Sequence, residues 1–202
     1  MEALGMVETR GLVAAIEAAD AMLYAVGVIE IKSIAKGVEA CDEALKSAEI
    51  RLITAHSSCP GKYEILITGE LSSVQAALDR VKMNYKSYII DIVLLGRIDE
   101  MVIKALLGGG LEAPKGALGV IETYSAASAI KAADTAVKTA KVDVLDLRIS
   151  RGMGGKGVAL ITGTIGAVQA SVEAGSEYAK RQGLFAASSV IPAPHDDLWK
   201  YL

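Results

Sequence analysis

The feature of this chain that most constrains its fold is an internal repeat. Residues 25–48 read AVGVIEIKSIAKGVEACDEALKSA, and residues 117–140 read ALGVIETYSAASAIKAADTAVKTA, 92 residues later. Further along, TGELSSVQAAL at 68–78 matches TGTIGAVQASV at 162–172, 94 residues later. Because the offset grows from 92 to 94, the two extra residues of the second copy must lie between these segments. They are expected in a loop, where length changes are tolerated. One supersecondary unit therefore occurs twice.

Each copy is predicted to fold as β-α-β-β-α-β. Short apolar runs rich in β-branched residues alternate with longer segments whose apolar residues recur at helical spacing. The predicted strands of the first copy are 26–31, 50–55, 63–68 and 88–95, with helices beginning near Ile34 and Ser72. The predicted elements of the second copy are 118–123, 126–140, 142–149, 157–162, 165–181 and 184–191. The predicted fold class is α+β: two tandem ferredoxin-like domains, each an antiparallel sheet with helices on one face.

The spacing of apolar residues predicts which helix faces meet the core. The first helix carries an apolar stripe that consists of Ile34, Val38, Cys41, Leu45 and Ala48. Cys41 matches Ala133 in the second copy and is interpreted as a small core residue. The expected core residues of the second helix are Val74, Leu78 and Val81, and Ser72 or Ser73 is expected to cap its N-terminus.

The repeat also predicts the domain organisation. The first domain is expected at 25–107 and the second at 117–202. Between them, GGGLEAPKG at 108–116 has four Gly and one Pro and is predicted to be a linker. Residues 1–24 hold a partial third copy of the repeat, with one strand and most of one helix. It cannot bury a core alone, so it adds a strand, competes with 25–42 for one place in the fold, or hangs loose.

Composition and charge exclude several function classes. The formal net charge of −3 comes without a Lys/Arg run, which disfavours nucleic acid and anionic membranes as partners. RNA-recognition domains share the β-α-β-β-α-β order but need stacking aromatics and basic residues, whereas YEILIT and GVALIT offer one Tyr. Two Cys without framework spacing argue against a disulfide-built secreted protein. No signal peptide or membrane-length apolar stretch is recognised, so a cytosolic globular protein is expected.

Three motifs resemble those of the bacterial microcompartment shell family. They are ALGMVETRG at 3–11, D-x-x-x-K-x-A at 42–48 and 134–140, and VIPAPH at 190–195. The resemblance covers both copies and implies a structural shell protein of the bacterial cytoplasm rather than an enzyme. It also implies a homotrimer that mimics a hexameric tile, with six domains around a central pore. Other shell proteins would be lateral partners, and small metabolites or electrons would use the pore.

A narrower resemblance concerns the loop that contains Cys59. The segments IKSIAKGVEA and SSCPGK are similar to those of tandem shell proteins of propanediol-utilising compartments, whose pore-loop Cys holds a [4Fe–4S] cluster on the three-fold axis. Such a cluster takes four ligands, usually Cys thiolates, and this chain has no C-x-x-C. Three copies of Cys59 would leave one iron for water or another ligand. The alternatives are an ordinary loop Cys in a metabolite-conducting tile, or a soluble redox carrier or sensor.

Two glycine-rich loops are expected to border the pore. Beside Cys59, the first loop supplies Ser58, Pro60 and Gly61, and the second supplies Arg151, Gly152, Met153 and Gly154. Both loops end in Gly-Lys. The second loop reads GMGGKG but fails the P-loop pattern twice, because position 150 is Ser and Gly157 follows the Lys. A ring of three Arg151 side chains would favour anionic metabolites, although a solvated loop Arg explains the residue equally well.

Three further residues are assigned to the tile edge by the resemblance: Lys46, Lys138 and His195. Without it, the two lysines are read as helix-terminal cations that complement the macrodipole. The closing motif departs from the family, which has Arg where this chain has Ala193, and the first copy reads LLGRIDEM instead.

Few residues suit catalysis or an independent metal site. His56 lies three residues before Cys59, but H-x-x-C lacks partners at zinc spacing, and a solvated or strand-end His is favoured. No Ser-His-Asp set, carboxylate pair or HExxH motif is recognised, and the chain has only two His. An enzyme is therefore the least favoured class.

Overall fold

The computed structural model describes residues 25–106, 108–109, 116–149 and 152–202. The partial copy expected at 1–24, the middle of the expected linker 108–116 and Arg151 lie outside these residues. Within them, the chain forms two α+β domains with four antiparallel strands each. The predicted fold class is confirmed.

Both domains follow the predicted β-α-β-β-α-β order. The first consists of β1 (Ala25–Ile31), α2 (Ile34–Ser47), β2 (Ile50–Ser58), β3 (Lys62–Gly69), α3 (Leu71–Tyr85) and β4 (Ile89–Leu95), followed by α4 (Glu100–Leu106). The second consists of β5 (Ala117–Thr123), α5 (Ala126–Thr139), β6 (Val142–Ile149), β7 (Gly157–Gly163), α6 (Ile165–Arg181) and β8 (Phe185–Ile191), followed by the short 3-10 helix η1 (Leu198–Tyr201). The strand orders are β2-β3-β1-β4 and β6-β7-β5-β8, so the two sheets have the same topology.

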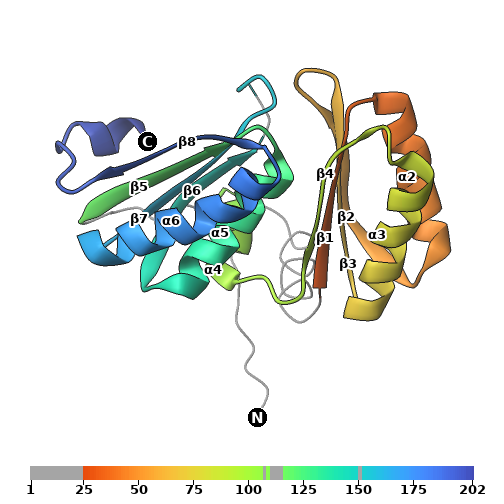
Figure 1. The fold of residues 1–202 in the computed structure, drawn as a ribbon, viewed down its shortest axis with the longest axis horizontal. Helices are drawn as coiled ribbons and strands as arrows, with labels where there is room; N and C mark the ends of the chain where they lie inside the picture. Colours follow the sequence, from red (N-terminus) through yellow and green to blue (C-terminus); the bar gives the residue numbers. More distant parts are fainter. Residues whose placement is uncertain (1–24, 107, 110–115, 150–151) are drawn as a thin grey trace, which may run out of the picture.

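The first sheet is buried on both faces. Side chains of a strand alternate between faces. Ile29 and Ile31 pack in one cluster with residues of α2 and α3, whereas Val28 packs in another with residues of α5. Figure 1 shows α2 and α3 on the side of this sheet that is turned away from the second domain. The outer face of the first sheet therefore rests on the helices of the second domain, and one core joins the two repeats.

The buried face of α2 differs from the predicted stripe. Ile34, Val38 and Leu45 are exposed, and the residues that face the sheet are smaller: Gly37, Ala40, Cys41 and Ala44. The predicted core roles of Ile34, Val38 and Leu45 are wrong for the isolated chain, whereas that of Cys41 is confirmed. The physical reason is close packing of the helix on the sheet. A Cβ atom on Gly37 would lie 2.3 Å from the Cβ of Tyr63.

The start of α3 also corrects a prediction. The helix begins at Leu71 with Glu70 at the N-cap position, and no side chain caps it. Ser72 and Ser73 lie inside the first turn, two and three residues past the N-cap position, so the predicted cap is wrong. The predicted core residues of this helix, Val74, Leu78 and Val81, are fully buried.

The closing segment of the first copy forms an element that the sequence did not predict. After β4 the chain turns through Gly96 and Arg97 into α4, which packs against the second domain at β6 and α5. Buried Val102 and Ile98 of this segment belong to the core that joins the domains. No helix in the described part of the chain is long and apolar enough to cross a membrane.

Candidate functional site

The two predicted pore loops lie side by side. Gly155, in the β6–β7 loop, is so close to the β2–β3 hairpin that a Cβ atom there would lie 2.6 Å from the Cys59 carbonyl oxygen and 2.9 Å from Pro60 Cδ. Its φ of +83° also favours glycine. Residue 155 must therefore lack a side chain for the loops to meet.

Cys59 occupies the exposed turn of its hairpin. The turn is closed by a 2.9 Å hydrogen bond from the Gly61 N–H to the Ser58 carbonyl oxygen, and Gly61 has a φ of +93°. The other cysteine, Cys41, is buried, and burial raises the pKa of its thiol. Of the two cysteines, Cys59 alone is accessible to a metal or an oxidant.

The other predicted pore residues differ in exposure. Pro60 and Gly61 are exposed beside Cys59, and Gly152 and Gly154 are exposed in the second loop. Met153 is half-buried. Ser58 is also half-buried, and its hydroxyl donates a 2.7 Å hydrogen bond to Glu64 Oε1. Ser58 therefore ties the hairpin to the sheet instead of presenting a free hydroxyl.

Lys62, which ends the first loop, joins the loops and the domains. Its ammonium group donates to Glu30 Oε1 at 2.7 Å, to the Tyr124 carbonyl at 3.0 Å and to the Gly155 carbonyl at 2.9 Å. The Lys62 side chain is largely buried and that of Glu30 is fully buried. The repeated Gly-Lys was the only sequence signal at this residue, and it did not predict a contact between the domains.

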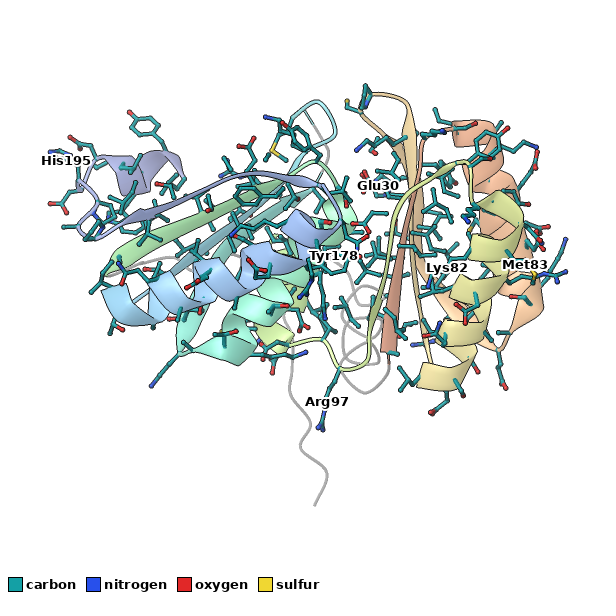
Figure 2. The ribbon with its side chains drawn as sticks, viewed as in Figure 1. Glu30, Lys82, Met83, Arg97, Tyr178 and His195 are labelled. Atoms are coloured by element: carbon teal, nitrogen blue, oxygen red, sulfur yellow. The ribbon has the colours of Figure 1, made fainter. Side chains whose placement is uncertain are left out.

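Glu30 is the buried partner of Lys62 in this junction (Figure 2). Its second carboxylate oxygen, Oε2, accepts a 2.9 Å hydrogen bond from the Ala126 N–H at the start of α5. A carboxylate at a helix N-terminus complements the free N–H groups and the macrodipole. Burial nevertheless raises the pKa of Glu30, with the Lys62 hydrogen bond acting in the opposite direction.

His56 faces a carboxylate rather than a set of metal ligands. Its Nε2 atom lies 3.5 Å from Glu64 Oε2, and Glu64 is buried directly across the sheet from Glu30. No group of three or more His, Cys, Asp or Glu side chains suited to a metal ion is found among the described residues. The preference for a strand-end His over half of an H-x-x-C site fits this position.

A second buried polar cluster lies between the domains, around Asp91 of β4. Its Oδ2 atom accepts hydrogen bonds from the hydroxyls of Ser125 and Ser128 at 2.6 and 2.5 Å. Its Oδ1 atom accepts from Tyr178 at 3.0 Å. Burial and the Asp91 carboxylate both raise the pKa of Tyr178, which Figure 2 labels beside this junction. Asp91 was not predicted from the sequence, because its counterpart in the repeat is Ala187.

The predicted tile-edge residues lie in different environments. Lys46 is exposed and pairs with Asp42 at 2.6 Å. Lys138 pairs with Asp134 at 2.7 Å and also donates to the Arg97 carbonyl, across the domain junction. His195 is exposed after β8 and lies far from the domain junction and from Arg97 (Figure 2). The structure does not bring these three residues together within one chain.

Arg97 is a further candidate edge residue, which was not among those predicted from the sequence. Leu95 pairs with Val26 and Ile191 pairs with Leu118, so Arg97 occupies the position of Ala193 in the second copy. Its side chain extends away from both domains (Figure 2). The signal was the single Arg in LLGRIDEM, two residues past the last strand.

Comparison with known proteins places this geometry in one family. The BMC domain model matches residues 25–98 and 117–194. The chain is 35% identical over 201 residues to the bacterial microcompartment shell protein PduT of Citrobacter freundii, covering 100% of this chain and 97% of the relative. It is also 39% identical over 87 residues to the shell protein PduA of the same organism, covering 43% of this chain and 90% of PduA.

A solved structure agrees with both fold and domain arrangement. The crystal structure of a microcompartment protein from Desulfitobacterium hafniense DCB has a TM-score of 0.73 and 40% sequence identity. The match covers 88% of this chain and 98% of that one. The likeness therefore extends over both domains rather than over a single repeat.

Proposed function

The chain belongs to the BMC-domain family of bacterial microcompartment shell proteins, and from this premise we propose that three copies close into a tile whose pore is bordered by the Cys59 loops. The protein is a tandem-domain structural component of the shell, as its relatives are by name, and not an enzyme. Three copies would supply the six domains that the single-domain relatives obtain from six chains.

One observation supports the pore proposal above all others. The β2–β3 and β6–β7 loops, which occupy equivalent positions in the two domains, meet at one end of the molecule and leave Cys59 exposed. Loops that are neighbours within one chain would alternate around a ring of three chains. The Cys59 thiols of the three copies would then face a common axis.

We further propose that the three Cys59 thiolates hold a [4Fe–4S] cluster on that axis. The donor set fits in kind, because the thiol is exposed and iron–sulfur clusters are bound by thiolates. The fit requires three copies, because the only other cysteine, Cys41, is buried in the core of its domain. The fourth iron position would be left to water or an exogenous ligand.

The residues around Cys59 would fix its position for this role. Ser58 ties one side of the hairpin to Glu64, and Lys62 ties the other to the second domain. Gly155 lets the neighbouring loop approach the Cys59 backbone. When bound, a cluster supplies one-electron chemistry, which suits electron transfer across the shell or redox sensing.

A metabolite-conducting tile without a cluster is the second candidate. Gly152 and Gly154 have open space where a Cβ atom would be, so the second loop presents bare backbone. Backbone N–H and C=O groups of this kind can line a pathway for small polar molecules. A soluble redox carrier or sensor would instead bind the cluster without assembling.

The tile edge is proposed to include Lys46, together with Lys138 and His195. Lys46 is well placed for lateral contact with other shell proteins, because its ammonium is exposed and, among the described residues, pairs only with the exposed Asp42. Lys138 would act in concert with Arg97, whose carbonyl it contacts.

Anaerobic purification tests the cluster proposal directly. Absorption and EPR spectra of the wild type are compared with those of Cys59→Ser, and the trimer mass is measured for both. Broad visible absorption and a reduced-state EPR signal, both lost in the variant while the trimer remains, would support a cluster on Cys59. Cys41→Ser is the matched control, because it removes the buried thiol and should leave the spectra unchanged.

The other outcomes separate the candidates. A colourless, iron-free trimer would leave the metabolite-conducting tile as the function. A coloured monomer with a reversible redox couple would favour the soluble carrier.

A further inference from the structure

A row of polar side chains crosses the first sheet on the face that meets the second domain. Strand pairing sets the order of this polar row: His56, Glu64, Glu30 and Asp91. The three carboxylates are buried, whereas the His56 side chain, at the edge of the sheet, is 24% exposed. The matching row of the second sheet has a single carboxylate and consists of Arg148, Val158, Glu122 and Ala187. The polar row is therefore a feature of the first copy and not of the repeat.

The three carboxylates of the polar row differ in how well they are hydrogen-bonded. Asp91 accepts from three side-chain hydroxyls, and Glu30 accepts from the Lys62 ammonium and the Ala126 N–H. Glu64 accepts the Ser58 hydroxyl at Oε1, but its Oε2 atom is buried and has no hydrogen-bond donor among the described residues. A buried carboxylate oxygen without a donor is costly. Glu64 Oε2 is thus the atom of the row that would gain most from a proton donor.

His56 is placed to supply that proton. Its Nε2 atom lies 3.5 Å from Glu64 Oε2, and its Nδ1 atom lies 3.3 Å from the Thr54 hydroxyl oxygen. The contact with Thr54 leaves Nε2 as the ring nitrogen that faces the carboxylate. Histidine is the side chain whose charge ordinarily changes between about pH 5 and 8. Because His56 is partly exposed, this pair can exchange a proton with water while the carboxylates stay buried.

The charges around the polar row favour binding of a proton. Lys62 is the cation that contacts the row, and one ammonium does not balance three carboxylates. Burial raises the pKa of Glu30, against the Lys62 hydrogen bond, and the neighbouring Glu64 charge adds to the rise. The helices α2 and α3 pack on the other face of the sheet, so their charged side chains do not face His56. Lys156 of the second loop is paired with Glu122. A proton on His56 therefore reduces an excess of buried negative charge.

We propose that His56 and Glu64 form a proton-binding site that is coupled to electron transfer at Cys59. The site adjoins the Cys59 hairpin, because Ser58 precedes Cys59 in the chain and donates to Glu64. One electron that reaches the Cys59 site from a one-electron donor adds negative charge beside the polar row. One proton from water, bound between His56 Nε2 and Glu64 Oε2, offsets that charge. The coupling is reciprocal, so a protonated His56 makes the electron easier to accept.

This inference rests on the proposed cluster and adds that a proton accompanies each electron. Redox titration of the complete, anaerobically purified protein, followed by EPR, measures the midpoint potential between about pH 5 and 8. In the wild type the potential should fall as pH rises. With one proton for each electron, each pH unit changes the reduction equilibrium constant about tenfold, or about 59 mV.

Variants identify the group that binds the proton. His56→Asn should make the midpoint potential independent of pH, and Glu64→Gln should weaken the dependence, because it removes the buried charge that the proton offsets. His195→Asn is the matched control: it removes the other histidine, which is 80% exposed after β8, and should keep the wild-type dependence.

A second measurement needs no cluster. In the iron-free protein, the 15N NMR signals of the His56 ring should move in Glu64→Gln, because Nε2 loses its charged neighbour. They should stay unchanged in Glu173→Gln, which removes an exposed carboxylate from α6. The ring signals of His195 serve as the internal reference and should be the same in all of these proteins.

The outcomes separate the coupling from the function on which it rests. A wild-type potential that does not change with pH, or a dependence that persists in His56→Asn, would overturn the coupling and leave the cluster in place. His56 ring signals that do not respond to Glu64→Gln would overturn the proton-binding pair. A colourless, iron-free wild type would refute the proposed cluster, and the coupling with it.

Discussion

Asp91 shows how one buried carboxylate can fix a domain junction. It comes from the first domain, but three of its hydrogen-bond donors, Ser125, Ser128 and Tyr178, come from the second. Its fourth donor is the adjacent Ile92 N–H. Hydrogen bonds made inside a protein are strong, and the penalty for leaving such donors unpaired is large.

We predict that Asp91→Ala lowers the free energy of unfolding by about 3 kcal/mol, because it leaves buried hydroxyls without an acceptor. Asp91→Asn retains one acceptor oxygen and should lower the free energy of unfolding by less than Asp91→Ala does. Urea denaturation followed by circular dichroism measures both. Asp79→Ala, which removes an exposed carboxylate, should change the unfolding free energy little; an equal loss in this control would contradict a special role for Asp91.

Glu30 gives the protein a pH dependence of predictable sign. Burial raises its folded pKa above the ordinary value of 4.5. Between the unfolded and the folded pKa, the folded state binds more protons, so the unfolding free energy falls as pH rises through that window. Glu30→Gln removes this contribution and keeps an acceptor for Lys62.

The unfolding free energy of the wild type, measured relative to Glu30→Gln, should therefore be higher near about pH 4.5 than at neutral pH. Urea titrations of both proteins across this range provide the measurement. A relative stability that rises with pH would mean that the Lys62 ion pair outweighs the burial of Glu30.

The sequence predicted the roles of residues that depend on their neighbours in the chain. It did not predict roles that depend on contacts across the domain junction. Cys41 was placed in the core from its spacing, and the position of Cys59 in a hairpin turn followed from its neighbours. Asp91 could not be found in this way, because its side-chain partners lie in the other domain and no spacing within one repeat encodes that contact. Arg97 could have been found from the single Arg that follows the last strand of the first copy.

At the scale of the element, the two copies of the first helix offer an internal comparison. Ser33 caps α2 through a 3.4 Å contact with the Lys36 N–H, and Ser125 caps α5 through a 2.9 Å bond with the Ser128 N–H. Ser125 also donates to Asp91. One sequence position thus has a purely local role in one copy and a local and a tertiary role in the other.

Ser33→Ala should lower the unfolding free energy by about 0.5 kcal/mol, the low end for loss of a cap. Ser125→Ala should cost about 2 kcal/mol, because the cap and a buried hydrogen bond are both lost. Thermal and urea unfolding of the matched pair compare these costs. Equal losses of unfolding free energy in the two variants would show that the hydrogen bond from Ser125 to Asp91 does not stabilise the fold.

The elements themselves were largely predictable, because strand and helix periodicities are local. All four strands and both helices of each repeat were expected from the pattern. Two errors have physical causes. The core face of α2 was assigned to its large apolar residues, although close packing on the sheet demands small ones. The Ser72/Ser73 cap was assigned from residue type, although α3 starts at Leu71 and its N-cap position is Glu70.

At the scale of the whole molecule, the repeat explains why large apolar residues remain on the surface of one chain. Each domain has an outer sheet face and an outer helix face. Within one chain, the sheet face of the first domain packs against the helix face of the second. In the described part of the chain, no domain covers the outer face of the second sheet or the exposed side of α2.

Lateral assembly of tiles gives the last prediction, because it should be separable from formation of the tile. Lys46 is 73% exposed and pairs with exposed Asp42. Exposed pairs contribute little to stability. Lys46→Ala should therefore leave folding and the trimer unchanged but abolish extended sheets in electron microscopy. Lys82→Ala removes an equal charge from α3, paired with Asp79, and should keep the sheets. If the sheets persist without Lys46, then Lys46 is not needed for lateral contact. Arg97 and Lys138, which contact each other across the domain junction, would then be the edge residues to test.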